Sequence, residues 1–379
     1  MTANWKLIML QSESLYGLLF HLLDVGLNQT KVDTARVNTI NQEDWERLFS
    51  LSMHHEVGAL MSDSLMKNDS INIPIDVWLK FVGLQEIAEQ AYLHHQRVLS
   101  DLLALFSDHG IPTMIIKGFS LAQYYPVPSH RKCGDIDIYQ FGLQPQSDEL
   151  VSKMLGVGIH QYIVSHHSNY SYKGVEIENH YQFITTYYKG NTVELESMLE
   201  DEAVNAIKAN ISMSNVFFPS PILNAVFLIC HMAGHFRGER VTLRQLIDWM
   251  MFLKNEYGNV DWKFVYEVYK NNNLLRFVNA INGILMRHLG MSKEFVFQYE
   301  EDRHLEQRIL YDMLNVTLLD DSKKELFSGV RHEWSQYIVS GWKFRLFNKY
   351  GCVELLKKVT AFLLHHNDFV DKEVYPKRV

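Results

Sequence analysis

The sequence predicts an α+β fold in which a small mixed sheet lies between two helical regions. Apolar residues follow a helical period up to about residue 110, and a helical period returns after Ser220. The intervening part holds short apolar runs and period-two patterns, which are typical of strands. We therefore expect a helical region, an α+β domain and a second helical domain, over residues 1–110, 111–215 and 216–379 respectively.

The composition is that of a globular chain of more than one domain. The 379 residues are 47% hydrophobic and 21% charged, and the formal net charge is −8. An acidic chain lacks the basic footprint of a dedicated nucleic-acid binder. Cys133, Cys230 and Cys352 lie far apart without paired spacing, so we expect no disulfide framework and a cytoplasmic location.

The apolar run over residues 14–27 resembles the core of a signal peptide only superficially. His21 and Asp24 interrupt it, Lys6 is the only preceding basic residue, and no small-residue cleavage site follows. We expect an amphipathic core helix there. No other run approaches the length of a membrane span, so no membrane association is expected.

The helical region and the first strand have clear boundaries. Helical spacing covers residues 44–65 and 76–109, after which Gly110 is expected to cap the second helix in the left-handed conformation. Pro112 prevents its continuation. The apolar run that follows predicts a buried strand over residues 113–116.

The middle of the chain is expected to alternate short helices and strands. Lys117-Gly118 leads into a helix over residues 119–125, closed by Pro126 and Pro128, and a strand carrying Asp135 and Asp137 follows. Later elements are a helix over 146–155 and two strands with acidic residues at period two, over 175–178 and 193–196. Beyond Ser220-Pro221, a strong helix start, helical patterns cover residues 221–236, 241–256, 261–290, 303–318, 331–348 and 352–367.

The segment Gly134-Asp135-Ile136-Asp137-Ile138 is the strongest chemical signal in the chain. Side chains alternate along a strand, so Asp135 and Asp137 project from one face while the isoleucines enter the core. Two neighbouring carboxylates repel each other unless a cation lies between them. Mg²⁺ favours one or two carboxylates together with substrate phosphates, so the pair predicts phosphoryl or nucleotidyl transfer.

Residues before this strand are suited to bind a phosphate. The N-terminus of the 119–125 helix offers unpaired N–H groups near the carboxylates if the two strands are neighbours. Gly118 permits close backbone approach, Lys117 adds a charge, Ser120 a hydroxyl and Arg131 a guanidinium.

A known family carries a similar arrangement. Lys117-Gly118-Phe119-Ser120-Leu121-Ala122, Tyr125-Pro126, Arg131 and Asp135-Ile136-Asp137-Ile138 resemble the signature of uncharacterised bacterial nucleotidyltransferase-like proteins, of the DNA polymerase beta-type superfamily. The later segment 174–180 and the region of His231, His235 and 243–248 resemble the same family. The resemblance covers roughly residues 85–255.

The resemblance implies a site as well as a fold. Asp135, Asp137 and a third carboxylate would bind Mg²⁺ or Mn²⁺, and the turn at Gly118 would hold a nucleoside triphosphate. Glu178 is the first choice for the third carboxylate, with Glu176 and Glu194 as alternatives. Lys117-Gly118 stands where the superfamily usually has Gly-Ser, which is a departure at the phosphate-binding turn.

Structural explanations exist for the same residues. An Asp-x-Asp pair also occurs on solvated strand edges, Lys117 could be a surface lysine, and Arg131 could pair with a carboxylate to hold its loop. His231 and His235, at i and i+4, could bind zinc, but no third ligand is evident. Packing histidines, a structural Arg244–Asp248 pair and a core stripe over 342–350 are the default interpretations of the remaining signals.

Together these observations predict a magnesium-dependent transfer of a nucleoside monophosphate from an NTP to the hydroxyl of an unidentified small molecule or protein. The main alternative is a catalytically inactive relative that binds a nucleotide or regulates a partner. A histidine-based metallohydrolase is a third hypothesis.

Overall fold

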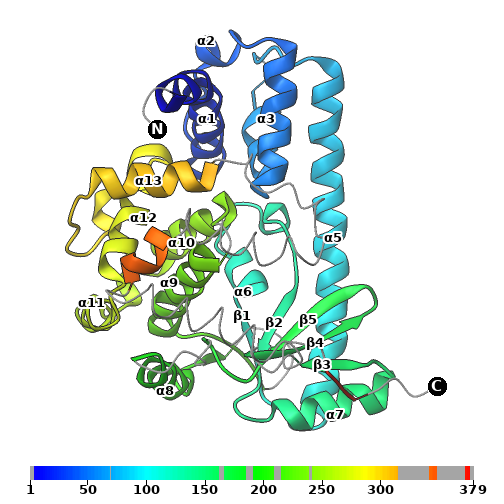
Figure 1. Ribbon diagram of the computed structural model, residues 1–379. Helices are drawn as coiled ribbons and strands as arrows, with labels where there is room; N and C mark the ends of the chain where they lie inside the picture. The colour runs from blue at the N-terminus through cyan, green and yellow to red at the C-terminus, as the bar shows by residue number, and fades with distance from the viewer. Residues whose placement is uncertain are drawn as a thin grey trace, which may run out of the picture.

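The computed structural model describes residues 4–68, 70–161, 166–184, 191–208, 215–238, 241–314, 341–347 and 372–375. In Figure 1 the N-terminal helices lie at the top, the sheet lies below them, and the helices that follow residue 220 lie on the left. The predicted α+β class is confirmed, because helices flank a mixed sheet on both sides. None of the described helices is long and apolar enough to cross a bilayer.

Five helices precede the sheet: α1 (Asn4–Asn28), α2 (Thr34–Val37), α3 (Gln42–His54), α4 (Gly58–Met66) and α5 (Ile75–Asp108). The helix expected over residues 14–27 is confirmed as part of α1. The single helix expected over residues 44–65 is wrong, since α3 ends at His54 and α4 begins at Gly58. Glu56 lies between them with a φ of 61°, a left-handed conformation that an α-helix cannot include.

Helix α5 belongs to two hydrophobic cores. Val77 and Phe81, near its start, pack with the upper helices. Val98, Leu102 and Phe106, near its end, pack beneath the sheet. Figure 1 shows the helix running unbroken from one region to the other. The helix therefore fixes the position of the sheet relative to the N-terminal helices.

The strands form one mixed sheet in the order β6-β7-β1-β2-β5-β4-β3-β8. Strand β2 is antiparallel to β1 and parallel to β5, and β7 runs parallel to β1. The predicted strand over 113–116 is confirmed as β1. The strand bounds are β1 (Thr113–Ile116), β2 (Ile136–Tyr139), β3 (Ile159–Gln161), β4 (His167–Tyr172), β5 (Val175–His180), β6 (Ile207–Lys208), β7 (Val216–Phe218) and β8 (Lys372–Tyr375).

The two faces of the sheet pack against different helices. Ile136, Ile138 and Ile177 point to the face covered by the end of α5 and by α7 (Gln144–Leu155). Alternation along β2 and β5 turns the intervening residues to the opposite face. That second face lies toward the helices that follow residue 190, and it carries the polar residues described below.

The short elements around the sheet include one correction. Helix α6 (Gly118–Ala122) follows β1, and a 3₁₀ turn, η1 (Pro128–His130), precedes β2. The strand expected over 193–196 is wrong, because these residues lie in helix α8 (Asn191–Ala203). Leu195 and Leu199, four residues apart, are both buried, so the helical period determines the burial on this segment.

The described residues between 221 and 314 are mainly helical, as predicted, whereas 216–218 and 372–375 are strands of the sheet. The expected helix over 261–290 is two helices, because Asn273 has a φ of 57° and breaks the segment. The predicted helices over 331–348 and 352–367 lie outside the described residues, except for 341–347, which are helical. The described elements are α9 (Pro221–Gly238), α10 (Leu243–Glu256), η2 (Tyr257–Asn259), α11 (Trp262–Asn271), α12 (Leu275–His288), η3 (Lys293–Phe295) and α13 (Arg303–Leu314).

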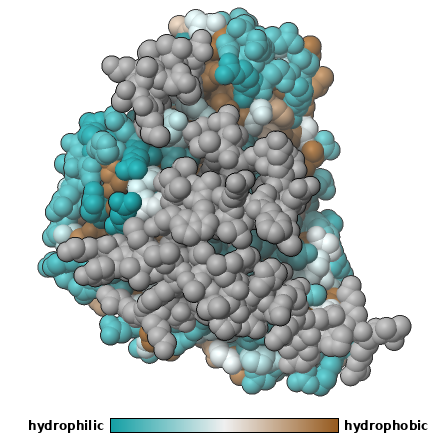
Figure 2. Space-filling model, in the orientation of Figure 1, coloured by the Kyte–Doolittle hydropathy of each residue, from teal (hydrophilic) through white to brown (hydrophobic). Residues whose placement is uncertain are grey.

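The face of the molecule drawn in Figure 2 is mainly hydrophilic where the described residues are visible, with hydrophobic residues in separate small patches. Scattered exposed apolar side chains of this kind are normal for a globular protein.

Candidate active site

The candidate site lies where β1, β2 and β5 run side by side. In the register of the sheet, Asp137 is paired with Ile116 on one side and with Glu178 on the other. Asp137 and Glu178 therefore project from the same face of neighbouring parallel strands. His180 follows Glu178 at period two, so it projects from that face as well.

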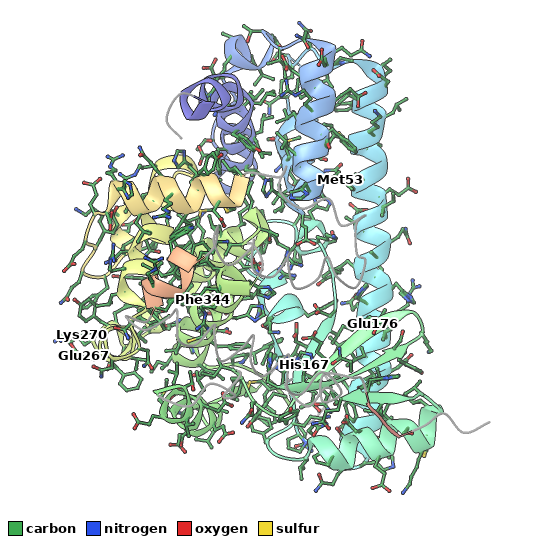
Figure 3. The ribbon with its side chains drawn as sticks, viewed as in Figure 1. Met53, His167, Glu176, Glu267, Lys270 and Phe344 are labelled. Atoms are coloured by element: carbon green, nitrogen blue, oxygen red, sulfur yellow. The ribbon has the colours of Figure 1, made fainter. Side chains whose placement is uncertain are left out.

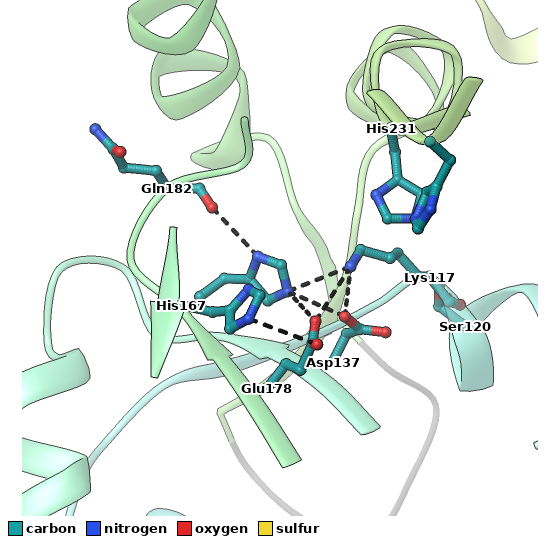
Figure 4. A network of polar contacts seen from close by, with 9 residues as sticks. Lys117, Ser120, Asp137, His167, Glu178, Gln182 and His231 are labelled. Atoms are coloured by element: carbon teal, nitrogen blue, oxygen red, sulfur yellow. Dashed lines mark hydrogen bonds and ion pairs between the residues drawn. The ribbon is translucent and has the colours of Figure 1, made fainter. Parts of the chain in front are cut away.

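Lys117 brings a positive charge to these two carboxylates (Figure 4). Its Nζ lies 2.6 Å from Oδ1 of Asp137 and 3.7 Å from Oε2 of Glu178. The residue is only 8% exposed, and its Nζ also lies 5.8 Å from the ring centre of Phe227 on α9. Lys117 is thus a buried member of the site and not a surface lysine.

His180 completes a compact polar group. Its Nε2 lies 3.0 Å from Oδ1 of Asp137, 3.5 Å from Oε2 of Glu178 and 3.4 Å from Nζ of Lys117. Its Nδ1 lies 3.3 Å from the carbonyl oxygen of Gln182. Because that oxygen can only accept, Nδ1 carries the proton and donates.

The charges of the group determine its protonation. Burial raises the pKa of Asp137, but Lys117 and His180 outweigh burial and hold it well below its ordinary value. Burial also raises the pKa of Glu178, yet His180 and Lys117 again prevail and lower it. Burial lowers the pKa of Lys117, and Asp137 and Glu178 raise it by more. At neutral pH the site therefore holds two carboxylates and one ammonium.

Asp135 lies at the edge of this group. It immediately precedes β2 and is exposed, whereas Asp137 is 3% exposed. Loss of water around the carboxyl, together with the charges of Asp137 and Glu178, raises the pKa of Asp135 to about 6. The two aspartates expected to act as a pair therefore differ in burial and in charge environment.

The structure gives definite partners to the other residues expected to bind phosphate. The hydroxyl of Ser120 donates to the carbonyl oxygen of Lys117 at 2.8 Å, and Gly118 begins helix α6. Arg131 is buried and makes two hydrogen bonds to Asp248 of α10. This pair replaces the expected pair between Asp248 and Arg244, whose Nε lies 3.1 Å from Oε2 of Glu56.

Of the three candidates for the third carboxylate, Glu178 stands beside Asp137. Glu176 lies near the turn that joins β4 to β5, and its side chain is exposed. His167, at the opposite end of β4, lies farther from that turn (Figure 3). Glu194 is on helix α8, is exposed, and lines a separate surface pocket of about 720 Å³. Only Glu178 among them contacts Lys117.

Histidines surround the site beyond those that the sequence suggested. Nε2 of His167 lies 3.5 Å from Oε1 of Glu178. Burial lowers the pKa of His167 to about 4 and that of His166 to about 2, so both rings are neutral at pH 7. His231 faces Lys117 from α9 (Figure 4), and burial holds its pKa well below the ordinary value. In the sequence, the signal that His180 belongs to the site was its position two residues after Glu178 on the same strand.

Two groups of described residues could hold a metal ion. Asp137, Glu178 and His180 form one, and His166, His167 and His180 form the other, with ligand atoms within 4.8 Å of one another in each group. His231 and His235 belong to neither group within the described part of the chain, and their Nε2 atoms lie 3.0 Å apart. A mixed oxygen and nitrogen donor set suits Mn²⁺ or another transition metal better than Mg²⁺, which prefers oxygen ligands.

Comparison with known proteins identifies a family for the chain. A sequence profile of the family described as uncharacterised nucleotidyltransferases matches residues 41–290, about two thirds of the chain. No match was found among curated proteins or among solved structures. The match covers the helices from α3 to α12 and includes all the residues of the candidate site. The chain therefore belongs to this family of uncharacterised nucleotidyltransferases.

Proposed function

We propose that the protein is a metal-dependent nucleotidyltransferase that transfers a nucleoside monophosphate from an NTP to the hydroxyl of a small molecule or protein. The observation that carries the proposal is the register of β2 and β5, which sets Asp137 beside Glu178 with a cation between them. Membership of the nucleotidyltransferase family supports the same reaction class.

The donor atoms fit a divalent cation. Asp137 and Glu178 offer carboxylate oxygens, and Nε2 of His180 offers a ring nitrogen that would have to be deprotonated to bind a metal. When bound, Mg²⁺ or Mn²⁺ would supply neutralisation of the triphosphate charge. Asp135, at the exposed edge of the site, is a third potential carboxylate ligand.

The remaining roles follow from burial and charge. The acceptor hydroxyl oxygen bonds to the α-phosphorus, the bond from that phosphorus to the bridging oxygen breaks, and pyrophosphate leaves. Asp135 is the best placed carboxylate to take the hydroxyl proton, because it is exposed at the edge of the site, whereas Asp137 is buried against Lys117. Glu178 holds the cation, and Lys117 and Gly118 contact the triphosphate. Arg131 acts through its pair with Asp248, holding the loop before β2.

Binding of labelled ATP, GTP, CTP and UTP with Mg²⁺ or with EDTA tests the proposal. We expect binding that requires the metal and is lost in Asp137→Asn. Asp101→Asn is the matched control, because Asp101 is an exposed aspartate on α5 that pairs with Lys173. Incubation of each protein with labelled NTPs, Mn²⁺ and a cell lysate then tests transfer. A labelled product formed equally by Asp135→Ala and by the unmodified protein would contradict the assigned chemistry.

A second candidate function is nucleotide binding without catalysis. The ion pair between Lys117 and Asp137 favours it, since the ammonium already neutralises a carboxylate that a catalytic metal would use. This alternative predicts nucleotide binding that EDTA does not change and no labelled product with any NTP. Binding that depends on Mg²⁺ and fails in Asp137→Asn would exclude it.

A further inference from the structure

Lys117 occupies a backbone conformation that favours glycine. Its φ of 48° and ψ of −124° lie outside the regions that residues with a Cβ adopt readily. Strain of this kind persists where the surrounding contacts fix it, and it clusters at functional sites. Glycine at this position would relieve the strain but remove the ammonium. The conformation directs the side chain into the group formed by Asp137, Glu178 and His180 (Figure 4).

The contacts of the ammonium are those of a bound cation. Oδ1 of Asp137, Oε2 of Glu178 and Nε2 of His180 converge on Nζ at 2.6, 3.7 and 3.4 Å. The two carboxylate oxygens each offer a lone pair to the ammonium. The same three residues form one of the two groups that could hold a metal ion. The lysine thus lies among the donors that a divalent cation would use.

The net charge of the site also indicates that the lysine takes the place of a metal cation. Asp135, Asp137 and Glu178 contribute three negative charges when ionised, and Lys117 contributes one positive charge. In the absence of nucleotide, the remaining two negative charges match a single divalent cation. Two-metal sites use a second cation for charge neutralisation in phosphoryl transfer, and an ammonium supplies part of that charge without any metal.

We propose that the ammonium of Lys117 occupies one cation position of the site and lowers by one the number of divalent cations that the protein binds. The inference rests on the proposed function only in that it requires the site to bind a divalent metal. It assigns Lys117 as a built-in cation, which makes the residue a determinant of metal number as well as a phosphate contact. Oδ2 of Asp137 is the oxygen left for the single metal, because the described contacts of Asp137 all use Oδ1.

Counting bound Mn²⁺ tests the inference. Electron paramagnetic resonance of free Mn²⁺, with a non-hydrolysable α,β-methylene NTP at saturation, gives the number of ions per chain. Lys117→Gly is the informative variant, because glycine accepts the φ of 48°. We expect Lys117→Gly to bind one more Mn²⁺ than the unmodified protein. Lys117→Arg, which keeps the charge, and Lys173→Ala, which removes an exposed lysine paired with Asp101, are expected to match the unmodified protein.

The outcomes separate the inference from the proposed function. Equal numbers in Lys117→Gly and the unmodified protein would overturn the inference and leave the metal-dependent function intact. No Mn²⁺ in the unmodified protein but one in Lys117→Gly would support the inference and overturn the proposed metal dependence. If circular dichroism shows Lys117→Gly to be unfolded, the number of Mn²⁺ ions bound by the unmodified protein tests the inference. One bound ion per chain supports it, and two bound ions overturn it.

Discussion

Arg131 and Asp248 form a doubly hydrogen-bonded ion pair that joins the loop before β2 to helix α10. Nε and Nη2 of Arg131 donate to Oδ1 and Oδ2 of Asp248 at 2.7 and 2.8 Å. The hydroxyl of Tyr125 donates to the same Oδ1 at 2.7 Å. Both charged side chains are buried, and a planar guanidinium matches a carboxylate in this geometry. The pair therefore fixes the loop that leads to Asp135.

The substitution Asp248→Asn is expected to destabilise the protein by about 3–5 kcal/mol, because it leaves the buried charge of Arg131 without a partner. The free energy of unfolding from urea titration measures the effect. Asp302→Asn is the control: Asp302 pairs with Arg276 at an exposed site, where the loss of an ion pair costs about 0–1 kcal/mol. Similar costs for the two variants would contradict the role given to Asp248.

Divalent cations are expected to stabilise the folded protein through the carboxylates of the site. At a Mn²⁺ concentration 100-fold above its dissociation constant, linkage predicts a gain of about 2.7 kcal/mol in the free energy of unfolding. The gain should disappear with EDTA and in Asp137→Asn. A melting temperature of Asp137→Asn that still rises with Mn²⁺ would place the cation elsewhere.

Asp135 is expected to make stability fall as the pH rises. Its folded pKa of about 6 lies above the ordinary value of 3.8, so the folded state holds the proton more tightly than the unfolded state. Its contribution is fully present below pH 3.8 and is lost as the pH passes 6. In metal-free buffer, Asp135→Asn should therefore melt higher than the unmodified protein at pH 8 and equally at pH 4. Glu149→Gln, an exposed substitution on α7, should change neither temperature. A higher melting temperature of Asp135→Asn at both pH values would point to a cause other than its titration.

His130 gives a pH dependence in the N-terminal region. Its Nδ1 lies 2.7 Å from Oδ1 of Asp63 on α4, and its Nε2 lies 3.1 Å from Oε1 of Glu89 on α5. Burial lowers the pKa of His130, but the two carboxylates outweigh it and raise the value above 6.5. The stabilisation by these contacts is thus fully present below pH 6.5 and is lost as the pH rises through the raised pKa.

For that reason His130→Gln is expected to cost about 2 kcal/mol at pH 5.5 and less at pH 9, since hydrogen bonds between charged groups are the stronger ones. Urea titrations at the two pH values measure the difference. His109→Gln, which changes an exposed histidine at the end of α5, provides the comparison. A cost for His130→Gln that is the same at both pH values would show that the ring acts without its charge.

Local patterns were sufficient to predict the strands that carry the site. The apolar run at 113–116 predicts a buried strand, and the alternation at 136–139 identifies Asp137 as a residue of the polar face. The alternation Val193-Glu194-Leu195-Glu196 gave a wrong strand, because four residues fit a helix as well as a strand. The burial of Leu195 and Leu199, four residues apart, shows that the helical period applies over a longer stretch than these four residues.

The arrangement of the site depended on information that the sequence does not display. The period of two placed Glu176 and Glu178 on one face, but the register that brings Glu178 beside Asp137 is a property of two strands distant in the sequence. The backbone conformation of Lys117 could not be predicted, because lysine has no preference for a positive φ. The partner of Arg131 could not be predicted either, because many carboxylates distant in the sequence could have paired with it.

The length of α5 has a mechanical consequence. Its 34 residues make a rod about 50 Å long that is anchored by apolar side chains at both ends. We therefore expect a displacement of the N-terminal helices to be transmitted through α5 and to change the tilt of the sheet. A fragment that starts at residue 111 would also remove α5 from the Ile177 face of the sheet and leave α7 as its main cover, so we expect the site on β2 and β5 to depend on the helices that precede it.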